Sequence, residues 1–287
     1  MKMKILLDKS IFHGQKFNEL KASPLQRISE RRIISVYGNP ILVEETLRLW
    51  FKGEKDLAKE QLSFIIAITN GRWFRTREEM WVGELCETSR RDKYFFVPQK
   101  EVEESINNIL MKINGTLDHQ EEQSFRNELA TQFRKDSNIR SACIGMRAEV
   151  AADLKTSGHK LKDIRESFDN YVSKNIDWLG EEIVKKYLPN LVDGKTIEHW
   201  KINKDSCPYF THWLKLFLYI TYYAMTKHDK PVDLNAIRDI GQLTDLQGLD
   251  ILVSDDVKFM KDAFDYFYGN SKRFMTSTEF LQYLSGL

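Results

Sequence analysis

The feature that most constrains this chain is an apolar run, Ile251–Ser254, that leads straight into two adjacent carboxylates, Asp255 and Asp256. Such a run predicts a short buried strand that delivers acidic side chains to the carboxyl edge of a sheet. That edge is where open α/β sheets bind ligands. The chain begins with the same pattern, because Ile5–Leu7 runs into Asp8. If the two strands are neighbours, Asp8 and Asp256 lie close together, and acids gathered in this way typically hold a divalent metal ion.

Strand and helix signals alternate at both ends of the chain, whereas the middle is largely helical. We expect strands at residues 1–8, 33–37, 251–254 and 273–275. Their alternation with helices predicts an α/β fold, with a parallel sheet flanked by helices. We expect a single domain, 1–287, with a core of about 1–52 and 230–287 and a large helical insertion of about 53–229.

Several residues mark where the helices of this core begin. Pro24 and Pro40 each stand where a helix is expected to start, and proline suits the first helical turn. Near the carboxyl terminus, Thr276 or Ser277 is expected to cap the final helix.

Composition restricts the classes of function. The 287 residues include 43 basic and 42 acidic ones, so any nucleic-acid binding depends on local patches. The three cysteines are far apart, which argues against a disulfide framework and predicts reduced thiols in a cytoplasmic protein. The most apolar segment, 209–225, is shorter than the ~20 residues of a membrane span, so we expect a buried helix and no membrane association.

Four acidic motifs occur in an order that resembles the PIN-domain nucleases. They are the strand end Asp8-Lys9-Ser10, the helical pair Glu44-Glu45, the helix-opening Asp239, and the strand end Ser254-Asp255-Asp256-Val257-Lys258-Phe259. The resemblance covers about residues 1–50 and 232–287 and leaves the helical middle unexplained. It departs from the family at Ile11, where many members have asparagine.

The resemblance implies a PIN-like core and a metal-dependent endonuclease. Its catalytic carboxylates and metal ligands correspond here to Asp8, Glu45, Asp239 and Asp256, with Glu44 and Asp255 as alternatives and with Ser10 and Ser254 as supporting hydroxyls. Mg²⁺ or Mn²⁺ accepts such all-oxygen ligation and assists hydrolysis of a phosphodiester. The family analogy favours RNA over DNA, in a toxin, a defence effector or an RNA-processing enzyme.

Each acid also has a purely structural interpretation. Asp8 after a strand is a typical turn former, Glu45 and Asp239 are compatible with solvated surface positions, and Asp255-Asp256 is compatible with a pair that caps the next helix. Two alternative functions therefore stay open. One is a catalytically inactive PIN-like scaffold that binds nucleic acid or protein, and the other is a structure-specific DNA nuclease.

A basic and aromatic stretch is the candidate nucleic-acid contact. Its residues are Arg72, Trp73, Arg75 and Arg77, a composition suited to phosphate contact and base stacking. A solvated loop with anchoring aromatic residues has a similar composition. The helical insertion is also a candidate surface for a protein partner. The motifs HExxH, Walker A, GxSxG and paired GxGxxG are absent from the sequence.

Overall fold

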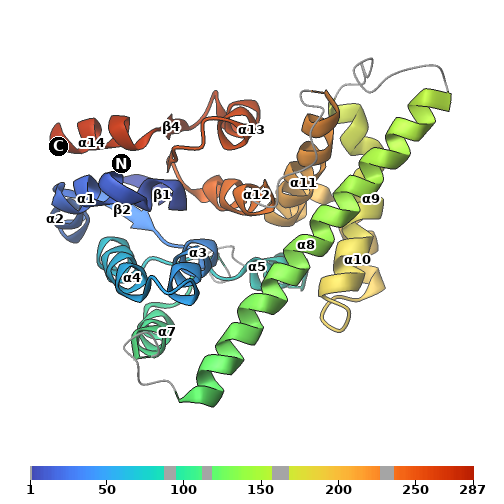
Figure 1. Cartoon of the computed structure of the whole chain (residues 1–287). Coiled ribbons are helices and arrows are strands. Elements are labelled where there is room, and N and C mark those ends of the chain that lie inside the picture. Colours follow the sequence, from blue (N-terminus) through green and yellow to red (C-terminus); the bar gives the residue numbers. More distant parts are fainter. Residues whose placement is uncertain (1, 87–94, 112–117, 157–167, 227–235) are drawn as a thin grey trace. The chain divides into compact units, whose positions relative to one another are not determined.

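The computed structural model of the chain describes residues 2–86, 95–111, 118–156, 168–226 and 236–287. The chain divides into two compact units. Unit 1 consists of Met1–Thr76, Phe95–Ala130 and Asp245–Leu287, and unit 2 of Arg77–Tyr94 and Thr131–Thr244. Unit 1 therefore contains both ends of the chain, which are blue and red in Figure 1.

Unit 1 is built around a four-stranded sheet in which all paired strands are parallel, in the order β2-β1-β3-β4. The strands are β1 (Met3–Leu7), β2 (Ile34–Tyr37), β3 (Ile251–Val253) and β4 (Arg273–Met275). β1 pairs directly with β3, with Leu7 beside Val253, so the first and last segments of the chain share one sheet. The expected α/β class, with a parallel sheet flanked by helices, is confirmed.

Helices pack around this sheet. They are η1 (Lys9–Phe12), α1 (Gly14–Ala22), α2 (Leu25–Glu30), α3 (Pro40–Phe51), α4 (Lys55–Thr69), α7 (Gln99–Met111), η5 (Leu246–Gly248), α13 (Phe259–Tyr268) and α14 (Ser277–Ser285). α2 and α4 pack against β2, whereas α13 and α14 pack against β4. Because helices cover the sheet, its two central strands are apolar throughout their paired parts, and Ile5, Leu6, Ile251 and Leu252 are fully buried.

The predicted helix starts are confirmed, and they position the carboxyl edge of the sheet. Pro40 occupies the first turn of α3, and Asn39 is the N-cap, whose side chain accepts a hydrogen bond from the Leu42 N–H. Pro24 is the N-cap residue of α2. Thr276 caps α14, and Glu279 completes the capping box. The ends of β2 and β4 at this edge therefore pass into helices, α3 and α14, with fixed starting points.

All the regular secondary structure described in unit 2 is helical. Its helices are α5 (Arg77–Cys86), α9 (Phe168–Tyr187), α10 (Gly194–Ile202), η4 (Lys204–Ser206), α11 (Pro208–Thr226) and most of α12 (Ala236–Asp245), while α8 (His119–Thr156) begins in unit 1. The buried indoles of Trp81 and Trp213 meet edge to face at 4.7 Å between ring centroids. The apolar segment expected as a buried helix is α11. None of the described helices is long and apolar enough to cross a membrane.

The division into units bears on the expected domain organisation. α4 and α7 fall in the range expected for the insertion, yet α4 packs against α3 within unit 1. The expected end of the insertion, near residue 229, lies outside the described residues. The single PIN-like domain with one insertion stays a prediction.

The first testable prediction concerns Asn39, which holds the helix that carries Glu45. Asn39 is fully buried, and its Nδ2 donates to Asp245 Oδ2 at 2.8 Å, while its Oδ1 caps α3. Asn39→Ala removes both bonds at once, so we expect the free energy of unfolding to fall by about 2–3 kcal/mol in urea denaturation. Asn18→Ala is the control, because Asn18 is exposed on α1. A loss at Asn39 no larger than the control would contradict the prediction.

Candidate metal centre

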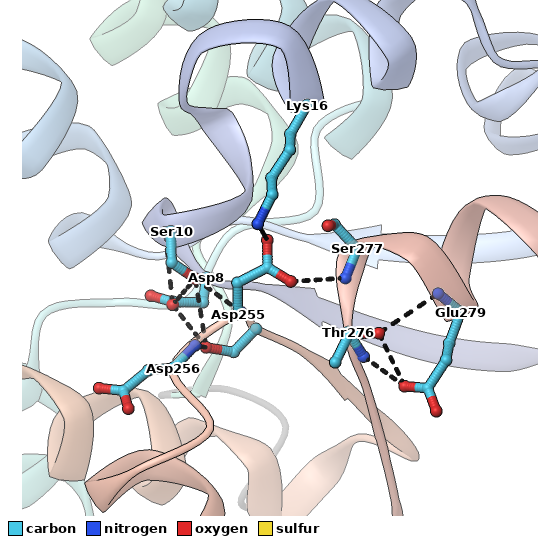
Figure 2. A network of polar contacts seen from close by, with 9 residues as sticks. Asp8, Ser10, Lys16, Asp255, Asp256, Thr276, Ser277 and Glu279 are labelled. Carbon is cyan, nitrogen blue, oxygen red and sulfur yellow. Dashed lines mark hydrogen bonds and ion pairs between the residues drawn. The ribbon is translucent and has the colours of Figure 1, made fainter.

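Asp8 lies at the carboxyl end of β1, where its backbone N–H donates to the Val253 carbonyl at 2.9 Å and so extends the sheet. The residue is 6% exposed. Its Oδ2 accepts a hydrogen bond from Ser254 Oγ at 2.7 Å and another from Ser10 Oγ. Figure 2 shows Ser10 beside this carboxylate. Asp8 also caps η1, because Oδ2 accepts from the Ser10 N–H at 3.3 Å. The acid is therefore both a turn former and a buried, oriented carboxylate.

The two serines join the ends of β1 and β3 into one network. Ser10 Oγ lies 3.3 Å from Ser254 Oγ and accepts from the Asp255 N–H at 2.9 Å. Ser254 Oγ in turn accepts from the Asp256 N–H at 3.1 Å. The hydroxyl of each serine thus contacts Asp8 and holds the loop after β3. This fixes the position of Asp8 relative to both acids that follow β3.

Asp255 ties three elements of unit 1 together. Its Oδ2 pairs with Lys16 Nζ of α1 at 2.8 Å, and its Oδ1 accepts from the Ser277 N–H at 2.9 Å, at the start of α14. Burial would raise the pKa of Asp255, but the hydrogen bonds from Lys16 and Ser277 outweigh it and bring the pKa below its usual value. Asp255 therefore stays ionised and acts as a structural anchor.

Asp256 belongs to the turn that leads into α13. Its Oδ1 accepts from the Lys258 N–H at 2.9 Å, and in Figure 2 its carboxylate extends away from Asp8. This contact lies in the turn before α13, whose N-cap residue is Lys258 and has no side-chain cap, so Asp256 does not cap that helix. Asp255 contacts the start of a different helix, α14. Asp256 is partly exposed at the same edge of the sheet as Asp8. Its role as a metal ligand stays a prediction.

Glu45 on α3 faces the same centre, because α3 packs against η1. Its Oε2 is buried. Burial above all, and then the negative charge of Asp8, raises the pKa of the Glu45 carboxyl to about 8. Glu44 acts on the same pKa only weakly. The choice of Glu45 over Glu44 as a ligand stays a prediction.

Lys9 and Gln61 are two members of this centre that the sequence analysis missed. Lys9 is 6% exposed although it directly follows Asp8, and its Nζ donates to Gln61 Oε1 at 2.5 Å. Burial lowers the pKa of Lys9 to about 8, against the attraction of Glu45 and Asp8. The helical pattern could have identified Gln61 as a buried polar residue, because it lies on the same face of α4 as the buried Ala58.

Asp239 lies on α12 within unit 2, partly buried. It is the one expected ligand outside unit 1, and its role also stays a prediction. The acid that closes α12, Asp245, belongs to unit 1 and is the buried partner of Asn39. Asp250 lies before β3, where its Oδ2 accepts from the Lys4 N–H at 2.8 Å. Asp250 is therefore at the amino edge of the sheet, opposite Asp8.

The first half of the basic and aromatic stretch is built into the fold of unit 1. Segment 72–74 bridges to the residue after β2, because the Gly38 N–H donates to the Arg72 carbonyl and the Phe74 N–H donates to the Gly38 carbonyl, both at 2.9 Å. Trp73 is 7% exposed, and a Cβ atom on Gly38 would lie 2.6 Å from its ring. Trp73 is therefore a core residue, with little surface to offer a stacking base.

The second half of the stretch is divided between the units. Arg75 in unit 1 lies 3.6 Å from Glu101 on α7. Arg77 opens α5 in unit 2, with its guanidinium carbon 5.1 Å from the Trp81 ring centroid and 5.3 Å from that of Trp213. Arg77 therefore contributes cation–π contacts to the core of unit 2. All three arginines of the stretch are partly exposed, whereas Trp73 is buried.

Comparisons of the chain with protein-family models, curated proteins and solved structures found no match. Among the residues that the structure describes, no group of three or more His, Cys, Asp or Glu side chains is arranged to hold a metal ion. The fold and the centre thus define a broad class, an α/β protein with carboxylates at the carboxyl edge of a parallel sheet. Among the expected ligands, Asp8 contributes to the raised pKa of Glu45 within unit 1.

The raised pKa of Glu45 generates a second prediction. Between its ordinary value of 4.5 and about 8, the folded protein holds a proton that the unfolded chain has released. The contribution of Glu45 to the free energy of unfolding is therefore fully present below pH 4.5. It is lost as the pH rises toward 8, by at most about 1.4 kcal/mol per pH unit. Lys9 has the opposite trend, with stability gained only between about 8 and 10.5.

We expect Glu45→Gln to flatten the fall in the free energy of unfolding between about pH 5 and 8, because glutamine does not titrate. The measurement is urea denaturation across this range, in buffer with EDTA. Glu44→Gln is the matched control on the same helix, and its curve should parallel that of the wild type. Parallel curves for Glu45→Gln and the wild type would show that Glu45 ionises normally.

Proposed function

We propose that the chain is a metal-dependent nuclease with a PIN-like core that hydrolyses phosphodiester bonds, in RNA rather than DNA. The observation that carries the proposal is the Asp8 carboxylate. It is buried at the carboxyl edge of the two central parallel strands, oriented by Ser10 and Ser254, and coupled to Glu45. Ligand sites of open α/β sheets lie at this edge. The order of the acidic motifs along the chain supplies the nuclease assignment and the preference for RNA.

The donor set suits one hard cation. Mg²⁺ is commonly bound through one or two carboxylates, with water and substrate phosphate as the remaining ligands, and Mn²⁺ also prefers oxygen ligands. Asp8 and Glu45 would hold such an ion, while Asp256, in the same unit, stays a candidate for a further contact. When bound, the ion would supply positive charge to the phosphodiester and activate water for attack. Arg72 and Arg75 are the candidate phosphate contacts.

The residues of this centre have separate tasks in the proposed reaction. Ser254 and Ser10 hold one oxygen of Asp8, so the carboxylate keeps one orientation when a cation arrives. Glu45 keeps a proton near neutral pH in the protein alone, and a cation beside it favours loss of that proton. The burial of both acids limits competing water at the centre.

The hydrogen bonds of Asp255 and Asp256 favour a second function. Asp255 and Asp256 both accept hydrogen bonds from backbone N–H groups at helix starts, which are structural roles. A catalytically inactive PIN-like scaffold that binds nucleic acid or protein requires only these roles. The two functions differ in whether the centre supports cleavage.

The test is cleavage of RNA, single-stranded DNA and double-stranded DNA with Mn²⁺, Mg²⁺ or EDTA. We expect metal-dependent cutting of RNA, and a loss of at least about 100-fold in Asp8→Asn and in Glu45→Gln, because each removes one proposed ligand charge. Asp250→Asn is the matched control at the opposite edge and should keep its activity. Preferential cutting of DNA would reassign the substrate. No cutting of any polymer would favour the scaffold, and cutting that survives both variants would show that Asp8 and Glu45 are not the catalytic centre.

A further inference from the structure

Aromatic side chains beside β2 carry an inference that rests on the proposed function. Two short segments continue the sheet of unit 1 past this strand, because Gly38 pairs with Trp73 in parallel and Phe74 pairs with Phe96 in antiparallel orientation. The Phe74 N–H donates to the Gly38 carbonyl at 2.9 Å, so the first pairing is a true backbone ladder. The side chains of both segments therefore follow the alternation of the sheet.

This alternation brings three aromatic rings to one face. Trp73 packs into the core on the opposite face, and its neighbour Phe74 points the other way. The Phe74 ring lies 5.9 Å from the ring of Tyr37 and 5.1 Å from that of Phe96, between centroids, and Tyr37 and Phe96 are 5.3 Å apart. We call Tyr37, Phe74 and Phe96 the aromatic row. Because Gly38 pairs with Trp73, the register also sets Arg72 beside Tyr37.

The aromatic row shares its sheet face with Asp8. Tyr37 is the partner of Leu6 in the register of β1 with β2, and Leu6 and Asp8 alternate with Leu7, which packs into the core on the opposite face. With a strand spacing of ~4.8 Å and a rise of ~3.3 Å per residue, the Cα atoms of Tyr37 and Asp8 are roughly 8 Å apart. One strand of substrate is long enough to contact both.

The aromatic row combines accessible rings with an unneutralised positive charge. Tyr37, Phe96 and Arg72 are partly exposed, whereas Phe74 is 1% exposed and supports the other two rings. Arg72 Nη1 donates to the Thr69 carbonyl at 3.0 Å, and among the residues that the structure describes no carboxylate pairs with this guanidinium. Its other N–H groups are therefore available to an anion.

We propose that the aromatic row and Arg72 bind a single strand of the RNA substrate, with an unpaired base stacked on Tyr37 or Phe96 and a phosphate on Arg72. Aromatic side chains on a sheet face commonly hold unpaired bases, and the guanidinium fork matches a phosphate group. In a duplex the faces of the bases are covered by their stacked neighbours. The aromatic row therefore selects single-stranded substrate for the centre at Asp8.

The experiment is titration of fluorescently labelled single-stranded RNA with the full chain in EDTA, followed by fluorescence anisotropy. We expect tighter binding of the single strand than of the same RNA as a duplex. Tyr37→Leu and Phe96→Leu each remove a ring but keep an apolar side chain, so each should weaken binding by about 5-fold or more. Arg72→Gln should weaken binding and reduce the slope of log affinity against log salt by about 0.7, whereas both leucine variants should keep the wild-type slope.

Three variants serve as controls. Tyr266→Leu changes an exposed ring on α13, and Arg273→Gln changes an exposed arginine on β4, at the opposite edge of the sheet. Both should bind RNA as the wild type does. Tyr37→Phe keeps the ring and should also bind as the wild type does. If one leucine variant does not fold, the other and Arg72→Gln remain decisive.

No binding of the single strand, equal or tighter binding of the duplex, or wild-type affinity in the leucine variants would overturn the inference. Because EDTA separates binding from cleavage, these results would leave the cleavage test of the nuclease standing. Ring-dependent binding without metal-dependent cleavage would reject the nuclease and would support the aromatic row as the contact surface of a scaffold.

Discussion

The hydrogen bond from Ser254 to Asp8 is the contact on which the rest of the centre depends. It joins residues 246 positions apart in sequence, at the ends of two strands that pair directly. A buried carboxylate needs such donors, because an uncompensated charge in the interior is strongly unfavourable. The sheet brings the two serines to Asp8, and Asp8 in turn links the turn after β1 to the loop after β3. Fold and site are therefore one hydrogen-bonded structure at this edge.

The sequence predicted the parts of unit 1 that follow from local patterns. Apolar runs placed all four strands. The common pattern of an apolar run followed by an acid raised the question whether the first and third strands are neighbours, and β1 does pair with β3. Proline and threonine marked the starts of α3 and α14, because their effects act within one helical turn. Glu45 was preferred over its neighbour by its place on the helix. These features need no knowledge of what packs against them.

The features that could not be predicted from the sequence depend on contacts between distant segments. The partners of Asp255, on α1 and α14, come from opposite ends of the chain, so no local motif reveals its structural role. The inward turn of Lys9 is set by Gln61 on α4. Trp73 was predicted to stack on a base because aromatic and basic residues alternate in its segment. The backbone hydrogen bonds between Gly38 and residues 72 and 74 instead hold this segment in the fold, where Trp73 is buried. Composition gives the kind of side chain, and packing decides whether it meets solvent.

The two unusual pKa values of the centre have a common origin. Burial holds Glu45 toward its neutral form and Lys9 toward its neutral form, while their mutual attraction opposes both shifts. In the protein alone, burial prevails for each group. Because the charge of each group acts on the other, a change in the burial of either side chain alters the ionisation of both.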